Sequence, residues 1–310
     1  MGPLRIHPKQ EAKVLQVTID NYKRHALVLT KWALESFYSP TTSEEWDDVL
    51  IEFLEAHPEY TLSKFTSTVA AVEFFFPNHK HHLPWARSVL TGWGTTNPTQ
   101  HTRPMGKWPS KLAACHITSM GHPRLALGAV VQAHCGLRPS EMLNLQSEDI
   151  VMPDETGSSL ERSPCLLGLG MRKGTKLKRA QVAKLFHKDR DVVEVLRRCR
   201  DATPPGQRLF PYTLRQYGRF LKEVEKRLQV DFGWTPHSAR AGFATDCRTE
   251  GMGFREIMEA GRWQAETSLR VYLDILGASD ISIKLRGKGL APALQWAASG
   301  WSCYFKEVIW

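Results

Sequence analysis

Four residues in the segment 235–274 have side chains that could bind and cleave a phosphate ester. His237 and Arg240 are three residues apart, and Tyr272 lies nine residues after Trp263. Residues three apart share one face of a helix, and a helix N-terminus already favours an anion. Arginine presents a permanent charge on a planar group that matches phosphate, and a tyrosine hydroxyl can act as a nucleophile. The pattern therefore predicts an anion site beside a nucleophile.

Each of these residues also has an ordinary structural explanation. An isolated pair such as His237 and Arg240 is usually part of a solvated surface. Tyr272 is flanked by leucines at helical spacing, which is typical of a core tyrosine, and Trp263 could equally anchor a core. None of the four is specific by itself.

Two further candidates lie upstream. Arg138 belongs to the segment 136–141, which reads GLRPSE, and Lys173 lies in a basic turn at 172–176. Gly136 is predicted to end one helix, and Pro139 to begin the next, which places Arg138 at a helix N-terminus. Arg138 could instead cap that helix or pair with Glu141, and Lys173 could be a solvated turn lysine.

Taken together, the order and spacing of these residues resemble the tyrosine recombinases, the site-specific integrases. The family pattern is an arginine in G-L-R-x-x-E, a lysine in a β-hairpin turn, H-x-x-R, a histidine or tryptophan, and a tyrosine nine residues later. In this sequence those positions are Arg138, Lys173, His237, Arg240, Trp263 and Tyr272. The resemblance covers roughly residues 105–276 and implies that family's catalytic fold.

The resemblance also implies a reaction, the transesterification of DNA. Tyr272 would attack phosphorus and leave a 3′-phosphotyrosine and a free 5′-hydroxyl. Arg138 and Arg240 would bind the non-bridging oxygens, His237 would handle the tyrosine proton, and Trp263 would donate its indole N–H. Because the covalent intermediate conserves the bond energy, neither a cofactor nor a metal ion is expected.

The basic hairpin supplies the remaining roles. Lys173 would protonate the departing 5′-oxygen, while Glu141 would hold the first arginine or the histidine in place. The family turn usually reads G-K-G, but here Arg172 precedes Lys173, so Lys176 stays a second candidate for the acid. The residues expected to contact DNA directly are Arg172, Lys176, Lys178 and Arg179.

Length and composition fit this interpretation. The chain has 310 residues, enough for two domains, and a net charge of +9, which suits a partner with phosphates. Its six cysteines are widely spaced without a CxxC pair, which predicts reduced, mostly buried thiols and an intracellular protein. We expect it to reside with its DNA, in the nucleus or the cytoplasm according to the host, without a secretion signal or membrane span.

The hydrophobic pattern predicts a mainly α fold with one small antiparallel β-sheet, in two domains. Residues 1–93 are expected to form a helical DNA-clamping domain. Its helices would cover about 10–38, 42–54, 61–76 and 85–93. Residues 94–109, rich in Gly, Thr and Pro, are predicted to be a linker.

Residues 110–276 are predicted to be the catalytic domain. We expect strands at 166–169 and 180–186 and helices over 110–135, 189–201, 213–229 and 254–260. Another helix is expected to begin at Pro236 with Thr235 as its cap. Residues 277–310 form an aromatic tail, for which docking on a neighbouring subunit and packing on its own domain are equally open.

Two other groups of residues could suggest metal chemistry. The run His79–His82 is too close in sequence to form a good tetrahedral site and is predicted to be a basic loop. Glu44, Glu45, Asp47 and Asp48 are predicted to be a solvated helix face, which disfavours a two-metal nuclease.

The expected function is strand exchange by a homotetramer on two sites in double-stranded DNA, with no membrane and no small-molecule substrate. One alternative is a type IB topoisomerase-like enzyme with a single bound duplex, although such enzymes usually have S-K before the tyrosine, whereas here Arg270 and Val271 precede it. Another is a DNA-binding relative that has lost turnover, but every catalytic position is filled.

Overall fold

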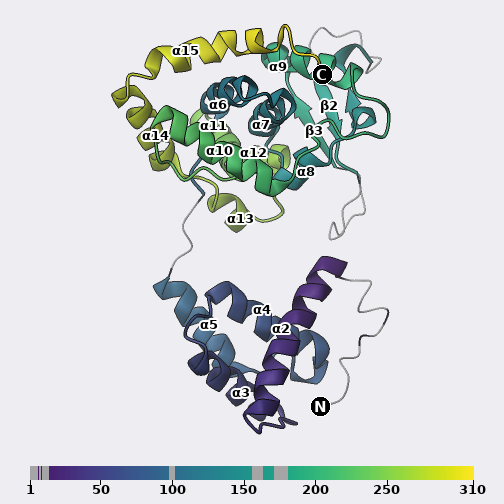
Figure 1. Cartoon of the computed structure of the whole chain (residues 1–310), viewed down its shortest axis with the longest axis vertical. Coiled ribbons are helices and arrows are strands. Elements are labelled where there is room, and N and C mark those ends of the chain that lie inside the picture. The colour runs from purple at the N-terminus through teal and green to yellow at the C-terminus, as the bar shows by residue number, and fades with distance from the viewer. Residues whose placement is uncertain (1–5, 7, 9–13, 98–101, 156–162, 171–180) are drawn as a thin grey trace. The chain divides into compact units, whose positions relative to one another are not determined.

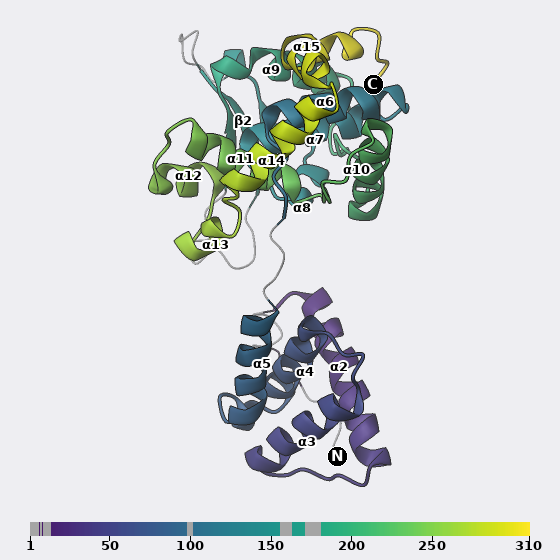
Figure 2. The ribbon, with the colours of Figure 1, turned by 90° about the vertical axis from the view of Figure 1, so that its left-hand side faces the viewer.

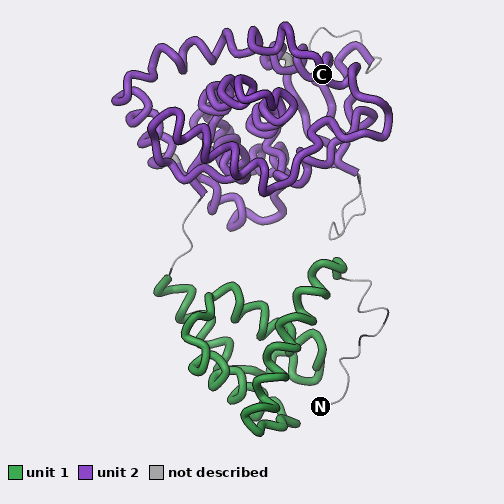
Figure 3. Tube along the Cα trace, viewed as in Figure 1, with its two compact units in different colours: residues 1–100 green, residues 101–310 purple. Residues whose placement is uncertain are grey.

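The chain divides into two compact units in the computed structural model, residues 1–100 and residues 101–310 (Figure 3). The structure describes all residues except 1–5, 7, 9–13, 98–101, 156–162 and 171–180. Helix reaches further into the predicted linker 94–109 than its composition suggests, because one helix ends at Thr96 and the next begins at Lys107.

Unit 1 is a group of helices packed around aromatic side chains. Its elements are α2 (Gln16–Glu35), α3 (Ser43–Ala56), α4 (Leu62–Phe75), η1 (Pro77–His79) and α5 (Pro84–Thr96) (Figure 1). Trp46, Phe53 and Phe65 are buried in its core. The predicted helices are confirmed, with α2 ending earlier and α5 ending later than expected.

Side chains accept free N–H groups at the starts of α3 and α5. The capping box predicted at Thr42 and Glu45 is confirmed, since each side chain accepts the other's backbone N–H. Asp47, by contrast, is buried and accepts the N–H groups of Trp85 and Ala86 at 2.7 and 2.8 Å. The predicted solvated acidic face was therefore wrong at Asp47, because the start of α5 needs an acceptor.

In unit 2, the other elements are arranged around two central helices, α6 and α7 (Figures 1 and 2). Its helices are α6 (Lys107–Ser119), α7 (Pro123–Cys135), α8 (Pro139–Leu143), α9 (Arg190–Asp201), α10 (Leu214–Leu228), α11 (Ser238–Thr249), α12 (Phe254–Gly261), α13 (Glu266–Arg270), α14 (Ile275–Gly287) and α15 (Ala291–Gly300). Short 3₁₀ turns are η2 (Ser147–Asp149), η3 (Pro153–Glu155), η4 (His187–Asp189) and η5 (Trp301–Phe305).

Two predicted helix boundaries in unit 2 were wrong. The single helix expected over 110–135 is two helices, since Gly121 has φ +83° and the residue before Pro123 is disfavoured in helical conformation. The helix expected to begin at Pro236 begins at Ser238, because Thr235 and Ser238 close a turn.

The sheet has three antiparallel strands in the order β1 (Ile150–Val151), β2 (Cys165–Gly168) and β3 (Val182–Leu185). Cys165 pairs with Leu185, and Gly168 pairs with Val182. The predicted hairpin is confirmed, and β1 was missed because two residues are too short for an alternating pattern. The basic turn between β2 and β3 lies outside the described residues.

The aromatic tail packs against its own unit in this structure. α15 contacts α6, α14 contacts α11, and Trp301 and Phe305 are fully buried. Nε1 of Trp301 donates a hydrogen bond to Asp191, which also accepts one from Lys111 at 2.7 Å. An aromatic stretch at a chain end is thus explained by burial.

The expected fold class, mainly α with a small antiparallel sheet, is confirmed. All six cysteines are free and five are buried, as their spacing predicted. Among the described helices, none combines the length and the apolarity that crossing a bilayer requires.

Candidate active site

The C-terminal end of α7 and the start of α8 form the base of the candidate site. Gly136 ends α7 in the left-handed conformation with φ +59°, and a Cβ there would lie 2.4 Å from the Phe243 ring. Glycine is therefore required both by the backbone and by the close packing. The chain then turns into α8 at Pro139, with Arg138 as the preceding cap residue. Both boundaries agree with the sequence prediction.

Glu141 is a buried carboxylate that holds Arg138. Only 1 % of Glu141 is exposed. One carboxylate oxygen accepts Nη1 of Arg138 at 2.7 Å, and the other accepts the Arg138 backbone N–H at 2.8 Å. The Arg138 side chain is 37 % exposed, so its guanidinium reaches from a buried anchor toward solvent. That arrangement fits a group that must meet a ligand.

Arg240 is buried where two helices end. It donates to the carbonyl of Gly136 through Nη1 and to the carbonyl of Gly261 through Nη2, the latter at 2.8 Å. Its Cζ lies 4.0 Å from the centre of the Trp263 ring and 5.9 Å from that of Tyr272. Helix C-termini carry partial negative charge and aromatic faces attract cations, so both surroundings favour the guanidinium.

The electrostatics of the cluster favour an added anion. Burial, followed by the charges of Arg138 and Arg262, lowers the pKa of Arg240 to about 9. Glu141 opposes this shift, but it is the one carboxylate among the described neighbours of three guanidinium groups. An anion bound between Arg138 and Arg240 would offset the repulsion and raise the pKa of Arg240 again.

His237 lies at the N-terminus of α11 beside these charges. Burial, and then Arg240 and Arg138, lower the pKa of His237 below its ordinary value. The imidazole is therefore neutral near pH 7 and can accept a proton. Its Nδ1 is buried and has no hydrogen-bond partner among the described residues.

Trp263 and Tyr272 form the aromatic wall of the site. Their ring centres lie 5.6 Å apart, and Phe243 stacks behind Trp263 at 6.5 Å. Thr245 donates to the Tyr272 carbonyl at 3.3 Å. Nε1 of Trp263 is buried and unpaired within the described part of the chain, so it is a donor available to a ligand.

The structure thus brings most of the predicted site residues together from distant parts of the sequence. The cluster contains Arg138, Glu141, His237, Arg240, Trp263 and Tyr272. Lys173 and its neighbours Arg172, Lys176, Lys178 and Arg179 lie outside the described residues, so their predicted roles stay predictions.

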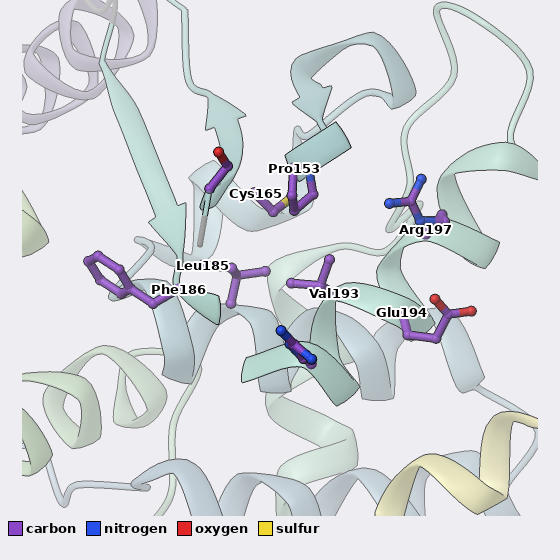
Figure 4. A pocket seen from close by; sticks show the side chains of 9 residues that line it. Pro153, Cys165, Leu185, Phe186, Val193, Glu194 and Arg197 are labelled. Atoms are coloured by element: carbon purple, nitrogen blue, oxygen red, sulfur yellow. The ribbon is translucent and has the colours of Figure 1, made fainter. Parts of the chain in front are cut away.

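A separate cavity of about 420 Å³ lies beside the sheet (Figure 4). Leu185, Phe186 and Val193 line it, with Glu194 and Arg197 on α9. No residue of the predicted cluster lines this cavity, so the two sites are distinct.

Comparison with known proteins agrees with the expected fold class. Residues 112–277, more than half of the chain, match the phage integrase family. The chain belongs to this family of tyrosine recombinases. Among curated proteins, none matches the sequence.

Two solved structures of the XerH site-specific recombinase share the fold. XerH bound to palindromic difH in a post-cleavage complex has 15 % identity and a TM-score of 0.59, over 92 % of this chain and 80 % of that one. A pre-cleavage XerH complex with difH has 15 % identity and a TM-score of 0.51, over 76 % and 68 %. XerA recombinase has 16 % identity and a TM-score of 0.41, over 90 % and 95 %.

A closer likeness to one relative rests on the sequence alone. The closing segment of this tyrosine recombinase resembles Cre recombinase in the HSAR motif at 237–240 and the EIMEAG step at 256–261. That particular likeness stays a prediction.

Arg262, next to the predicted Trp263, was missed by sequence reasoning. It donates to Glu141 at 3.0 Å and to the Gly136 carbonyl at 3.2 Å. The available signal was an arginine directly after the glycine that ends a helix, where a basic residue can reach helix carbonyls.

A row of basic residues on α10 was missed as well. Arg215, Arg219 and Lys222 are exposed at helical spacing and line an open cavity of about 530 Å³. Their spacing in the sequence already places them on one face.

We expect inorganic phosphate to stabilise this tyrosine recombinase through the arginine cluster. At tenfold excess over the dissociation constant, binding adds about 1.4 kcal/mol to the free energy of unfolding. Arg138→Ala should lose most of this gain in thermal unfolding at matched ionic strength. Arg255→Ala, which removes an exposed arginine, should keep it. Equal stabilisation of all three proteins would contradict an anion site at Arg138.

Proposed function

We propose that the protein is a site-specific DNA recombinase that cleaves and rejoins strands through a 3′-phosphotyrosine at Tyr272. The observation that carries this proposal is the buried Arg240 guanidinium packed on the rings of Trp263 and Tyr272. Arg138 extends toward the same cluster from its anchor on Glu141. A phosphodiester is the substrate that needs both the positive charge and the nucleophile.

Arg138 and Arg240 stabilise the charge that develops on the non-bridging oxygens in the transition state. Both guanidinium groups are fixed before substrate arrives, Arg138 by a carboxylate and Arg240 by two backbone carbonyls. Donors that are already oriented need no rearrangement during the reaction, and loss of one typically slows it by about 10²–10³-fold.

His237 and Trp263 assist the attack of Tyr272 on the phosphate. A free tyrosine has a pKa of about 10, so its hydroxyl needs a base to become a good nucleophile. The lowered pKa of His237 keeps its imidazole neutral and able to take that proton. The indole N–H of Trp263 donates to a phosphate oxygen.

Lys173 acts as the general acid toward the 5′-oxygen, with Lys176 as the alternative. Departure of an alkoxide needs a proton in the transition state, and a lysine beside arginines and phosphate can supply it. Arg172, Lys178 and Arg179 then contact the DNA backbone, and so does Lys176 if Lys173 is the acid.

DNA is the partner that the surface of unit 2 supports. The exposed row Arg215, Arg219 and Lys222 presents three cations along one face of α10. Phosphate contacts of this kind supply affinity and position the protein on the duplex. The XerH structures were solved with difH substrate, and we assign the same class of ligand to this chain.

The assembly we propose is a homotetramer that joins two DNA sites, in which unit 1 also binds DNA. Strand exchange requires two broken duplexes at once, whereas a topoisomerase-like enzyme needs one. Recombinant products from two differently labelled duplexes distinguish these functions, and neither needs a metal ion or a nucleotide cofactor.

Tyr272→Phe should abolish covalent capture without weakening binding, because only the hydroxyl forms the bond. Duplexes are first selected for binding from a randomised pool and then nicked, so that the cleaved fragment diffuses away and the adduct accumulates. Tyr304→Phe, which changes a partly exposed tyrosine of the tail, is the matched control and should form adduct like the native protein.

Adduct from Tyr272→Phe would show that another residue is the nucleophile. Tight binding by the native protein without any adduct would identify a relative that binds DNA but has lost turnover.

Replacing the 5′-bridging oxygen with sulfur should identify the general acid. A thiolate leaves without a proton, so the sulfur substrate should restore cleavage to Lys173→Ala, which is otherwise slowed by about 10²–10⁴-fold. The rates of adduct formation on the oxygen and sulfur duplexes measure this. Rescue of Lys176→Ala instead would assign the role to that lysine.

A further inference from the structure

Arg262 has a backbone conformation that is unusual for its residue type. It is the C-cap of α12, with φ +60° and ψ +42°, in the left-handed region. Glycine is the usual residue at such a helix end, because a side chain there is disfavoured. The contacts of the Arg262 side chain must therefore offset the free-energy cost of this backbone conformation.

The Arg262 side chain is only 8 % exposed and makes several contacts inside unit 2. Nη2 donates to a Glu141 carboxylate oxygen at 3.0 Å and to the Gly136 carbonyl at 3.2 Å. Nη1 donates to the carbonyls of Ala260 at 3.1 Å and Cys135 at 3.5 Å. The side chain thus ties the end of α12 to the end of α7 and to α8.

We propose that Arg262 is a positioning residue that fixes Arg138 through their shared carboxylate, Glu141. This inference rests on the proposed function, in which Arg138 binds the reacting phosphate. Glu141 accepts Arg138 with one oxygen, while the oxygen that accepts Arg262 also accepts the Arg138 backbone N–H. Both carboxylate oxygens of Glu141 are thereby held, and this fixes the orientation of Arg138.

The contacts of Arg262 separate it from the arginines that meet substrate. Its Nη groups donate to protein oxygens, and its Nε is buried without a partner among the described residues. The Arg138 side chain, by contrast, is 37 % exposed. Arg262 therefore acts on the reaction through other residues.

Arg262 also sets how strongly Glu141 binds Arg138. The positive charge of Arg262 partly cancels the field of the buried Glu141 carboxylate at Arg138, so the net attraction on Arg138 is smaller. Without Arg262, the full charge of Glu141 would act on Arg138 and draw it away from a phosphate. Arg262 additionally shares the Gly136 carbonyl with Arg240, so the loss of one donor changes the surroundings of both catalytic arginines.

Arg262→Gly is a clean test because glycine suits the left-handed backbone. We expect this variant to keep the salt dependence of duplex binding and to lose at most the affinity of one misplaced phosphate contact, since Arg262 itself does not face solvent. Its adduct formation on the nicked duplex at saturation should slow by up to about 100-fold, which is the effect of a misplaced reacting group. Arg262→Lys should be intermediate, since an ammonium keeps the charge but not the planar fork.

Gln229→Gly is the matched control. Gln229 ends α10 in the same left-handed conformation with φ +53° and is exposed. This variant should cleave at the native rate, which shows that glycine at a helix end is not itself harmful.

A double-mutant cycle distinguishes positioning from simple support of the fold. If Arg262 acts through Arg138, Arg262→Gly should slow an Arg138→Ala protein much less than it slows the native protein. Independent effects that multiply, or native-rate cleavage by Arg262→Gly, would overturn the inference.

Phosphate binding decides the inference even if cleavage fails. Absence of adduct from the native protein would refute the proposed function. Thermal unfolding with inorganic phosphate still compares the native protein with Arg262→Gly. Weaker phosphate binding by the variant supports positioning of Arg138, and equal binding overturns it.

Discussion

The burial of one guanidinium, that of Arg240, constrains the packing of unit 2 around the candidate site. Moving this charge out of water is expensive unless oriented dipoles replace the water. The carbonyls of Gly136 and Gly261 do so, and each lies at the end of a helix. Neither position has room for a side chain, because a Cβ would meet the Phe243 ring at Gly136 and the Trp263 ring at Gly261. The ends of α7 and α12 and the rings of Trp263 and Tyr272 thus pack together around the charge of Arg240.

This arrangement of charges also explains why we expect the site to bind an anion. Arg138, Arg240 and Arg262 are held close together around one carboxylate, and burial, together with the neighbouring positive charges, lowers the pKa values of Arg240 and His237. Such crowding produces electrostatic repulsion that a bound phosphate would relieve. Burial and the same positive charges lower the pKa of His237, so its imidazole is neutral near pH 7 and, in the proposed reaction, would be able to accept a proton.

The sequence predicted the parts of the site that depend on residue type and spacing. His237 and Arg240 had to share a face, and Gly136 and Pro139 marked the helix boundary that places Arg138. It did not predict contacts set by tertiary packing. Arg262 was not singled out, Asp47 was predicted to be solvated, and for the tail that holds Trp301 two alternatives stayed open, yet each residue has its partner on another element. The boundary at Thr235 was missed because a turn there competes with the expected cap.

The proposed reaction is tested most directly by identifying the residue to which the DNA becomes covalently attached. After capture on a nicked, selected duplex, nuclease and trypsin digestion should leave a nucleotide on the peptide 271–284, which lies between Arg270 and the cleavage after Lys284. Fragmentation in the mass spectrometer should place the added mass on Tyr272, attached through its phosphate. A nucleotide on any other residue, or none on a protein that binds the duplex tightly, would contradict the account.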